Sequence, residues 1–184
     1  MIKIGKYILL AGMAVLCVGN CALFNPDQEK KDRIEQEFLF EFNYTGARGY
    51  ENEGFYIDYE GQVIFYRYDA GRDAPWEPED FLHPTTEELL EKYNHFPQQV
   101  RVIDPDTLYA QYLLIHEAAA GTYSERVNTG ADIGSYAYIC YVYHVNRDQY
   151  DAIYLDEWGD SSYENLSPAA DSLVSWLETI ITSP

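Results

Sequence analysis

Basic residues are scarce in this sequence. It has 12 Lys and Arg against 31 Asp and Glu in 184 residues, which gives a formal net charge of −19. Phosphate groups repel so acidic a chain, and no stretch of it concentrates Lys and Arg, so nucleic acid is excluded as a partner. Low-complexity tracts and internal repeats are also lacking, which excludes solenoids and other repeat architectures.

The motifs of the common enzyme classes are lacking as well. His116-Glu117 is followed by Ala120, where a zinc protease would place its second His. Ser135 lies outside the Gly-x-Ser-x-Gly frame of a hydrolase. No glycine-rich loop is spaced to hold a phosphate or a dinucleotide. We therefore expect no catalytic residues, no cofactor and no metal site.

Cysteine is limited to Cys17, Cys21 and Cys140. Cys140 lies in an aromatic, strand-like stretch, where a thiol serves as a small apolar side chain rather than a nucleophile. If the chain is cleaved before Cys21 and that thiol is lipidated, no disulfide can form within the mature protein. A Cys21–Cys140 disulfide in an unlipidated protein is the alternative.

The first twenty residues have the layout of a secretory signal. Lys3 and Lys6 precede an apolar, uncharged run over residues 7–18, and acidic residues begin only at Asp27. A transmembrane helix needs about 20 apolar residues, and Lys6 and Asn20 interrupt any span of that length. A cleaved signal is expected, with an uncleaved anchor as the alternative.

The leader ends in Val18-Gly19-Asn20-Cys21, which resembles the lipobox of bacterial lipoproteins, with Asn20 in place of the usual small residue. The resemblance covers the leader alone. It implies that Cys21 carries the lipid and becomes the N-terminus of an envelope protein on the extracytoplasmic face of a membrane. Ala22, rather than Asp, after that Cys favours the outer membrane in a Gram-negative host.

The expected organisation is a signal peptide over residues 1–20, a lipidated tether over 21–35 and one folded domain over 36–184. Hydrophobic residues make up 47% of the chain and aromatic residues 16%, enough for a sizeable core. The length suits a single domain.

Alternating apolar residues predict several strands. Phe38, Phe40, Phe42 and Tyr44 recur with period two, which predicts one buried face. Glu60-Gly61 separates two aromatic runs and predicts a hairpin. A short strand is expected over 99–103. Residues 136–145 form the strongest strand, with 151–158 as its antiparallel partner.

Capping residues predict three helices. Thr85 and Glu88 form a capping box, Asp104-Pro105 opens a helix that runs to Ala120, and Ser167-Pro168 opens the last one. Strands joined by short turns and interspersed with helices predict the α+β class, with helices packed on one face of an antiparallel sheet. The other face is expected to expose many of the 18 tyrosines.

Two tryptophans mark candidate partner-binding sites. Trp76 lies in a long acidic loop over residues 69–84, where its alternative role is to plug the end of the sheet. Trp158 lies among Asp156, Glu157 and Asp160 at the end of a predicted strand. Long loops and tryptophans are frequent in binding surfaces.

The expected function is non-enzymatic binding or scaffolding of a protein or glycan partner by a domain that a lipid on Cys21 tethers to a membrane. One alternative is an envelope hydrolase that uses the carboxylates at 156–160. Another is an acidic inhibitor or immunity-type protein that binds a basic target.

Overall fold

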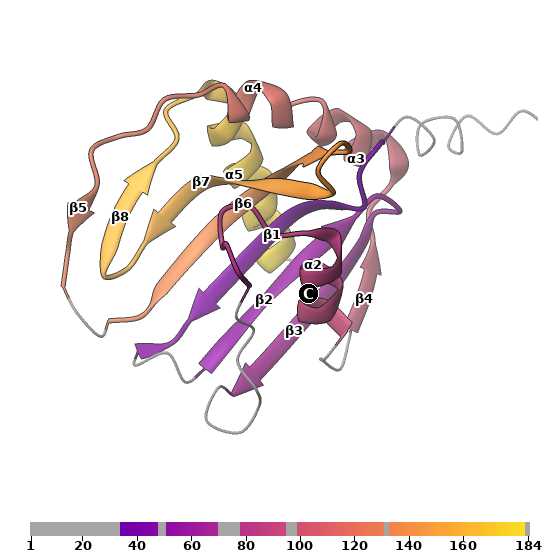
Figure 1. Ribbon diagram of the computed structural model, residues 1–184. Helices are drawn as coiled ribbons and strands as arrows, with labels where there is room; N and C mark the ends of the chain where they lie inside the picture. Colours follow the sequence, from indigo (N-terminus) through magenta and orange to yellow (C-terminus); the bar gives the residue numbers. More distant parts are fainter. Residues whose placement is uncertain (1–33, 48–50, 70–77, 95–98, 131–132, 183–184) are drawn as a thin grey trace, which may run out of the picture.

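The computed structural model describes residues 34–47, 51–69, 78–94, 99–130 and 133–182 (Figure 1). The predicted leader, the tether to residue 33 and Trp76 lie outside these ranges. No helix within them is long and apolar enough to cross a membrane.

One antiparallel sheet of eight strands runs through the domain in the order β4-β3-β2-β1-β6-β7-β8-β5. The sheet joins two meanders along the pair formed by β1 and β6. The strands are β1 (Phe38–Thr45), β2 (Glu51–Asp58), β3 (Gln62–Asp69), β4 (Gln99–Val102), β5 (Val127–Asn128), β6 (Ser135–His144), β7 (Gln149–Trp158) and β8 (Ser161–Glu164). The predicted mixed α+β class with an antiparallel sheet is therefore confirmed.

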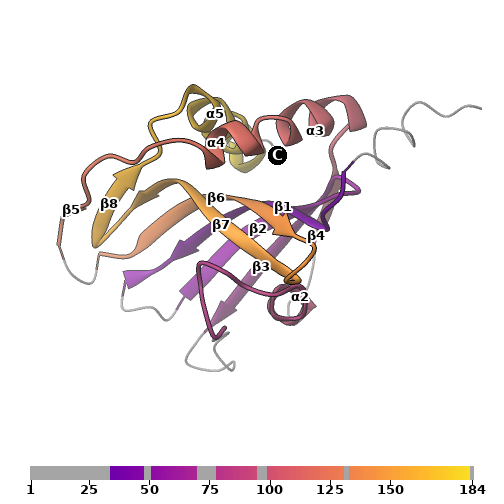
Figure 2. The same cartoon turned by 45° about the horizontal axis from the view of Figure 1, so that its top comes forward.

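Three helices cover one face of the sheet, as Figure 2 shows: α3 (Pro105–Tyr112), α4 (Ile115–Ala119) and α5 (Pro168–Thr182). Leu173 and Leu177 of α5 are fully buried, and Trp176 meets Phe40 of β1 edge-on at 5.1 Å between ring centroids. Buried Cys140 belongs to this core. The apolar spacing predicted for α5 is thus the face that packs on the sheet.

The fourth helix, α2 (Thr86–Asn94), lies against the opposite face (Figure 2). Its Leu89 and Tyr93 are buried in a second core with Phe38 and Tyr56. The expectation of helices on one face therefore holds for three helices and fails for α2. The tyrosine-rich face is consequently covered there rather than exposed, and Tyr93 stacks on Tyr56 with centroids 3.7 Å apart.

A β-bulge makes the predicted alternation of β1 wrong at its first residue. The register of β1 against β2 shifts between Phe38 and Phe40. Phe38 therefore faces the α2 side, whereas Phe40 and Phe42 face α5. A bulge adds one unpaired residue, which reverses the side on which each following residue lies. Glu41 is thereby turned into the second core, where it is fully buried.

The local turn and cap predictions are confirmed. Gly61 turns β2 into β3 with φ +80°, a conformation that glycine adopts without strain. The Thr85 hydroxyl accepts from Glu88 N–H, and Glu88 Oε2 accepts from Thr85 N–H at 2.7 Å, which completes the capping box. The helix predicted from Asp104 to Ala120 is instead two helices, interrupted at residues 113–114.

Candidate binding cavity on the face covered by α2

A buried carboxylate forms the floor of a cavity on the α2 side of the sheet. Glu41 Oε1 accepts from Lys92 Nζ at 2.6 Å and from the Tyr66 hydroxyl at 2.8 Å. Its Oε2 accepts from the Tyr93 hydroxyl at 2.5 Å and from the Tyr141 hydroxyl. These four donors come from β3, α2 and β6. We call Glu41, Tyr66, Lys92, Tyr93 and Tyr141 the Glu41 network.

The Glu41 network keeps its carboxylate ionised. Burial is the largest influence and raises the pKa of Glu41, but the Lys92 charge and the hydrogen bonds from Lys92, Tyr141 and Tyr93 outweigh it, so that its pKa is lowered overall. The Lys92 side chain is 10% exposed and the Glu41 side chain is 0% exposed. A buried ion pair persists when hydrogen bonds satisfy its remaining polar atoms, as they do here.

The hydroxyls of Tyr93 and Tyr141 stay protonated. Burial, together with the adjacent Glu41 charge, raises the pKa of Tyr93 and of Tyr141 well above the ordinary value of 10.0. Both hydroxyls can therefore only donate to Glu41 over the physiological pH range. The hydroxyls of Tyr93 and Tyr141 also lie 3.5 Å apart, so the network is a connected, hydrogen-bonded floor.

Gly54 of β2 makes the contact between Tyr66 and Glu41 possible. It lies between Asn43 of β1 and Tyr66 of β3 in the sheet register. A Cβ at position 54 would lie 2.9 Å from the Tyr66 hydroxyl and 2.0 Å from the Phe42 carbonyl oxygen. Because glycine leaves this space empty, the Tyr66 hydroxyl reaches over β2 toward β1.

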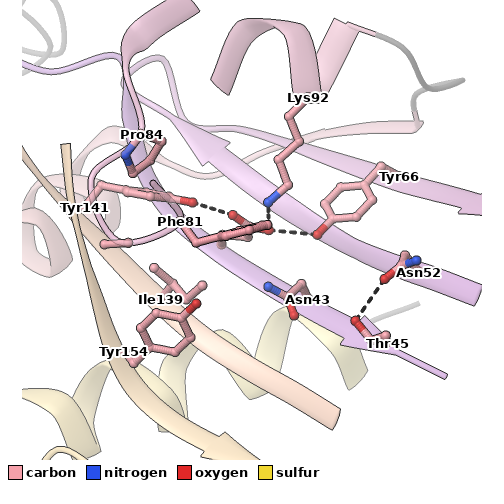
Figure 3. Close-up of a pocket in the computed structure, with 12 residues that line it drawn as sticks. Asn43, Thr45, Asn52, Tyr66, Phe81, Pro84, Lys92, Ile139, Tyr141 and Tyr154 are labelled. Atoms are coloured by element: carbon pink, nitrogen blue, oxygen red, sulfur yellow. Dashed lines mark hydrogen bonds and ion pairs between the residues drawn. The ribbon is translucent and has the colours of Figure 1, made fainter. Parts of the chain in front are cut away.

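The segment before α2 forms one wall of the cavity. Pro84 and Leu82 carbonyls accept from Tyr150 N–H and Ala152 N–H, each at 2.9 Å, so this segment runs along β7. β8 pairs with β7 only at Asp156 and Glu157, which leaves the edge near residues 150–152 open to the segment. Phe81 and Pro84 are thereby held beside the strands (Figure 3).

The cavity has a volume of about 160 Å³. All members of the Glu41 network except Tyr93 line it, together with polar strand residues and apolar side chains. The lining residues outside the network are Asn43, Thr45, Asn52, Phe81, Pro84, Ile139, Ala152 and Tyr154. Thr45 Oγ1 donates to Asn52 Oδ1 at 2.9 Å, which fixes that amide. A mixed apolar lining with a few placed polar groups is the usual composition of a ligand pocket.

Two polar groups face the cavity without a hydrogen-bond partner in the described part of the chain: the side chains of Asn43 and Tyr154. In Figure 3 the Tyr154 hydroxyl points toward Asn43 across the floor. Both residues are only partly buried. Burial, with the Glu41 charge next, raises the pKa of Tyr154 to about 12, so its hydroxyl stays neutral and able both to donate and to accept.

A second, more open hollow contains three of the four described residues predicted as a partner site. Asp156, Glu157 and Trp158 line it together with Tyr136 and Tyr163, and its volume is about 340 Å³. Trp158 is 47% exposed and stacks on Tyr136 with centroids 5.8 Å apart. Burial, then the charges of Glu164 and Glu178, raises the pKa of Asp156, which is the direction that the hydrolase alternative needs for a general acid.

Asp160, the remaining described member of that prediction, has a different position. Its carboxylate accepts from Ile133 N–H at 3.1 Å and its carbonyl accepts from Thr129 N–H at 3.0 Å. Asp160 therefore holds a turn outside the hollow. Trp76 lies outside the described residues, so its placement is not assigned.

The three histidines in the described ranges, His83, His116 and His144, do not form a metal site with one another. His83 and His144 both lie near Asp151, with His144 Nε2 at 2.7 Å and His83 Nε2 at 3.8 Å from its carboxylate oxygens. Among the residues that the structure describes, no three His, Cys, Asp or Glu are grouped so as to hold a metal ion. His116 is exposed on α4.

Sequence reasoning missed the Glu41 network. The sequence offered one signal: Glu41 is a single acidic residue between two phenylalanines in a predicted strand. An acidic residue in a strand is usually exposed, so this position gave no reason to expect a buried carboxylate. No family model, no curated protein and no solved structure matches this chain.

Proposed function

We propose that this chain is a non-enzymatic binding protein of the bacterial envelope, tethered by a lipid on Cys21, and that its domain holds a small polar ligand in the cavity above the Glu41 network. The observation that carries the proposal is the pair formed by Asn43 and Tyr154. Both present hydrogen-bonding groups to a cavity, and neither has a partner in the described chain. Both groups are partly exposed to water, which a ligand would replace without rearranging the floor beneath.

The chemistry of the floor supports binding rather than catalysis. All four hydrogen bonds that Glu41 accepts are made within the protein, and its pKa is lowered, so it is a weak base without a proton to give. A general acid or base needs a pKa near the working pH and access to the substrate. Glu41 meets neither requirement.

The cavity is tested by native mass spectrometry of protein extracted gently from its own membrane. We expect the wild type to retain a small-molecule adduct. Asn43→Leu, which blocks one side of the cavity, is expected to lose the adduct. Asn146→Leu, on the exposed turn between β6 and β7, serves as the matched control and is expected to keep it. Equal adduct in Asn43→Leu, or none in the wild type, contradicts a ligand in this cavity.

The tether is tested by the same spectra and by fractionation. If the chain is a lipoprotein, the measured mass equals that of residues 21–184 plus acyl chains. Cys21→Ser is then expected to move the protein out of the membrane fraction. Cys140→Ser is the matched control, because Cys140 is buried in the core and cannot carry a lipid there. A full-length mass, or membrane retention of Cys21→Ser, contradicts the tether.

The hollow around Trp158 favours a second candidate, the acidic protein that binds a basic target. Arg126 already places its guanidinium 4.2 Å from the Tyr163 ring centroid and 3.9 Å from Glu157, which is the contact that an external Arg would make. The test is calorimetric titration with an Arg-rich peptide. Salt-sensitive binding that Trp158→Ala weakens supports this candidate, and binding unaffected by salt or by Trp158→Ala counts against it.

A further inference from the structure

The floor of the cavity carries one negative and one positive charge, which cancel. This balance restricts the charge of a ligand that the cavity can hold. Glu41 is ionised, and the ammonium of Lys92 lies 2.6 Å from it. A cationic ligand would meet Lys92, and an anionic one would meet Glu41 and a chain of net charge −19. Burying a further charge without a counter-ion is costly. The cavity therefore suits a neutral ligand.

The side chains of Asn43 and Tyr154 together suit a ligand that both donates and accepts hydrogen bonds. The Asn43 amide offers two N–H donors and one carbonyl acceptor, and the Tyr154 hydroxyl offers one donor and one acceptor. They face one another across the floor (Figure 3). Hydroxyl groups on adjacent carbons match such a pair, because each hydroxyl donates one hydrogen bond and accepts others.

The remaining lining supplies an apolar surface beside these polar groups. Ile139 and Ala152 lie on the strands, and Phe81 and Pro84 lie on the segment before α2. Phe81 is 58% exposed, so its ring forms part of the rim of the cavity. Pyranose rings have this division, with hydroxyls around the edge and C–H groups on the faces, which pack against aromatic rings.

The volume of the cavity matches one sugar ring. A water molecule takes up about 30 Å³ in the liquid, so a cavity of about 160 Å³ replaces roughly five waters. One hexose ring is of this size, and a disaccharide would extend past the Phe81 rim.

We propose, on the basis of the binding function above, that this cavity binds a single neutral hexose ring. Asn43 and Tyr154 bind its hydroxyls, and its C–H face packs on the apolar part of the lining. The ring comes either from a free monosaccharide or from the terminal residue of an envelope glycan, since both present the same chemistry.

The test is saturation-transfer NMR and calorimetric titration of the folded domain with glucose, galactose, mannose and N-acetylglucosamine. We expect saturable binding of at least one of them, and at least tenfold weaker binding of the corresponding uronic acid and amino sugar. Tyr154→Phe and Asn43→Leu are expected to weaken binding roughly tenfold or more, the loss of about one or two hydrogen bonds. Tyr59→Phe, at an exposed turn, is the control.

The outcomes separate the class of ligand from the binding function itself. Saturable binding that Asn43→Leu and Tyr154→Phe weaken and Tyr59→Phe does not supports the hexose. Binding of a disaccharide through the same terminal ring with equal affinity identifies a glycan end, and loss of affinity on extension identifies a free sugar. No binding of any neutral hexose, or equal binding of the charged analogues, overturns the hexose assignment. A cavity adduct of another mass would then leave the broader binding function standing.

Discussion

Glu41 is the residue on which the α2 side of the domain depends. Its partners come from distant parts of the sequence, Lys92 being 51 and Tyr141 100 positions away. No local pattern in the sequence connects them, because the contact arises only once β1, β6 and α2 are assembled. The sequence does predict the strand that carries Glu41, but predicts an outward side chain for it. The buried carboxylate is therefore a consequence of tertiary structure.

Removing the charge of Glu41 is expected to destabilise the domain strongly. Glu41→Gln keeps the shape but leaves the Lys92 ammonium buried without a counter-ion, which costs about 3–5 kcal/mol of unfolding free energy. Chemical denaturation measures this loss. Because Lys92→Met removes the stranded charge, the double variant is expected to recover at least about 1 kcal/mol relative to the sum of the single losses.

A surface ion pair provides the control for that comparison. Arg67 and Glu51 lie 3.9 Å apart, and both side chains are about two-thirds exposed. Glu51→Gln is expected to change the unfolding free energy by less than about 1 kcal/mol. If Glu41→Gln costs no more than Glu51→Gln, the Glu41 network does not stabilise the fold.

The lowered pKa of Glu41 predicts a loss of stability in acid. The ordinary pKa is 4.5 and the folded value lies below it. Below pH 4.5 the unfolded chain takes up a proton that the folded chain does not, so the unfolding free energy falls as the pH falls toward the folded pKa. The contribution approaches about 1.4 kcal/mol per pH unit.

Urea titrations between pH 3 and pH 7 measure this contribution as a difference between two proteins. Asp80, Glu88 and Asp148 also have lowered pKa values, so the wild-type slope is composite. The wild-type curve is expected to be steeper than the Glu41→Gln curve below pH 4.5. Parallel curves would show that Glu41 has no lowered pKa in the folded state.

Some elements of the fold are determined by residues close together in sequence, and others only by tertiary contacts. The Gly61 turn and the capping box of Thr85 and Glu88 were predictable, because they depend on residues two to four positions apart. The bulge at Phe38–Phe40 and the position of α2 were not, because neither leaves a local pattern. Asp156, Glu157 and Trp158 line one hollow because they are adjacent in sequence, and their role in binding a partner stays a prediction.

At the scale of the strand, β2 is expected to tolerate no side chain at Gly54. Gly54→Ala would place a Cβ against the Phe42 carbonyl and the Tyr66 hydroxyl, which costs about 1–3 kcal/mol of unfolding free energy from overpacking alone. Thermal unfolding measures the change. Gly130→Ala is the matched control, because its Cβ would make only ordinary contacts, the nearest at 3.6 Å from Ile133.

A second substitution shows whether Gly54 acts through the Glu41 network. If the added Cβ displaces the Tyr66 hydroxyl from Glu41, Tyr66→Phe is expected to cost less in the Gly54→Ala background than in the wild type. Strictly additive losses would mean that position 54 affects the backbone of β2 without disturbing the network.

At the scale of the whole molecule, the excess of negative charge is expected to oppose folding. The formal charge of −19 becomes −21 if the leader, with two lysines and no acidic residue, is removed. Like charges repel more in the compact state than in the extended one. Added salt screens this repulsion, since the Debye length falls from about 30 Å at 0.01 M to about 8 Å at 0.15 M.

The melting temperature of the folded domain is therefore expected to rise by several degrees between low and physiological salt. The Glu41–Lys92 pair contributes little to this change, because it is buried and therefore poorly screened. A fall in melting temperature with added salt would mean that attractive surface pairs outweigh the repulsion.

Repulsion between Glu178 and Asp156 is one local part of this effect. Glu178 is exposed on α5, and its charge, with that of Glu164, helps to raise the pKa of Asp156 after burial has done so. Glu178→Lys is thus expected to raise the melting temperature at low salt and to reduce its dependence on salt. Glu117→Lys, exposed on α4, makes the same change in net charge away from Asp156 and is expected to do less. If the two variants respond alike, net charge alone destabilises the domain, and the local crowding around Asp156 does not contribute.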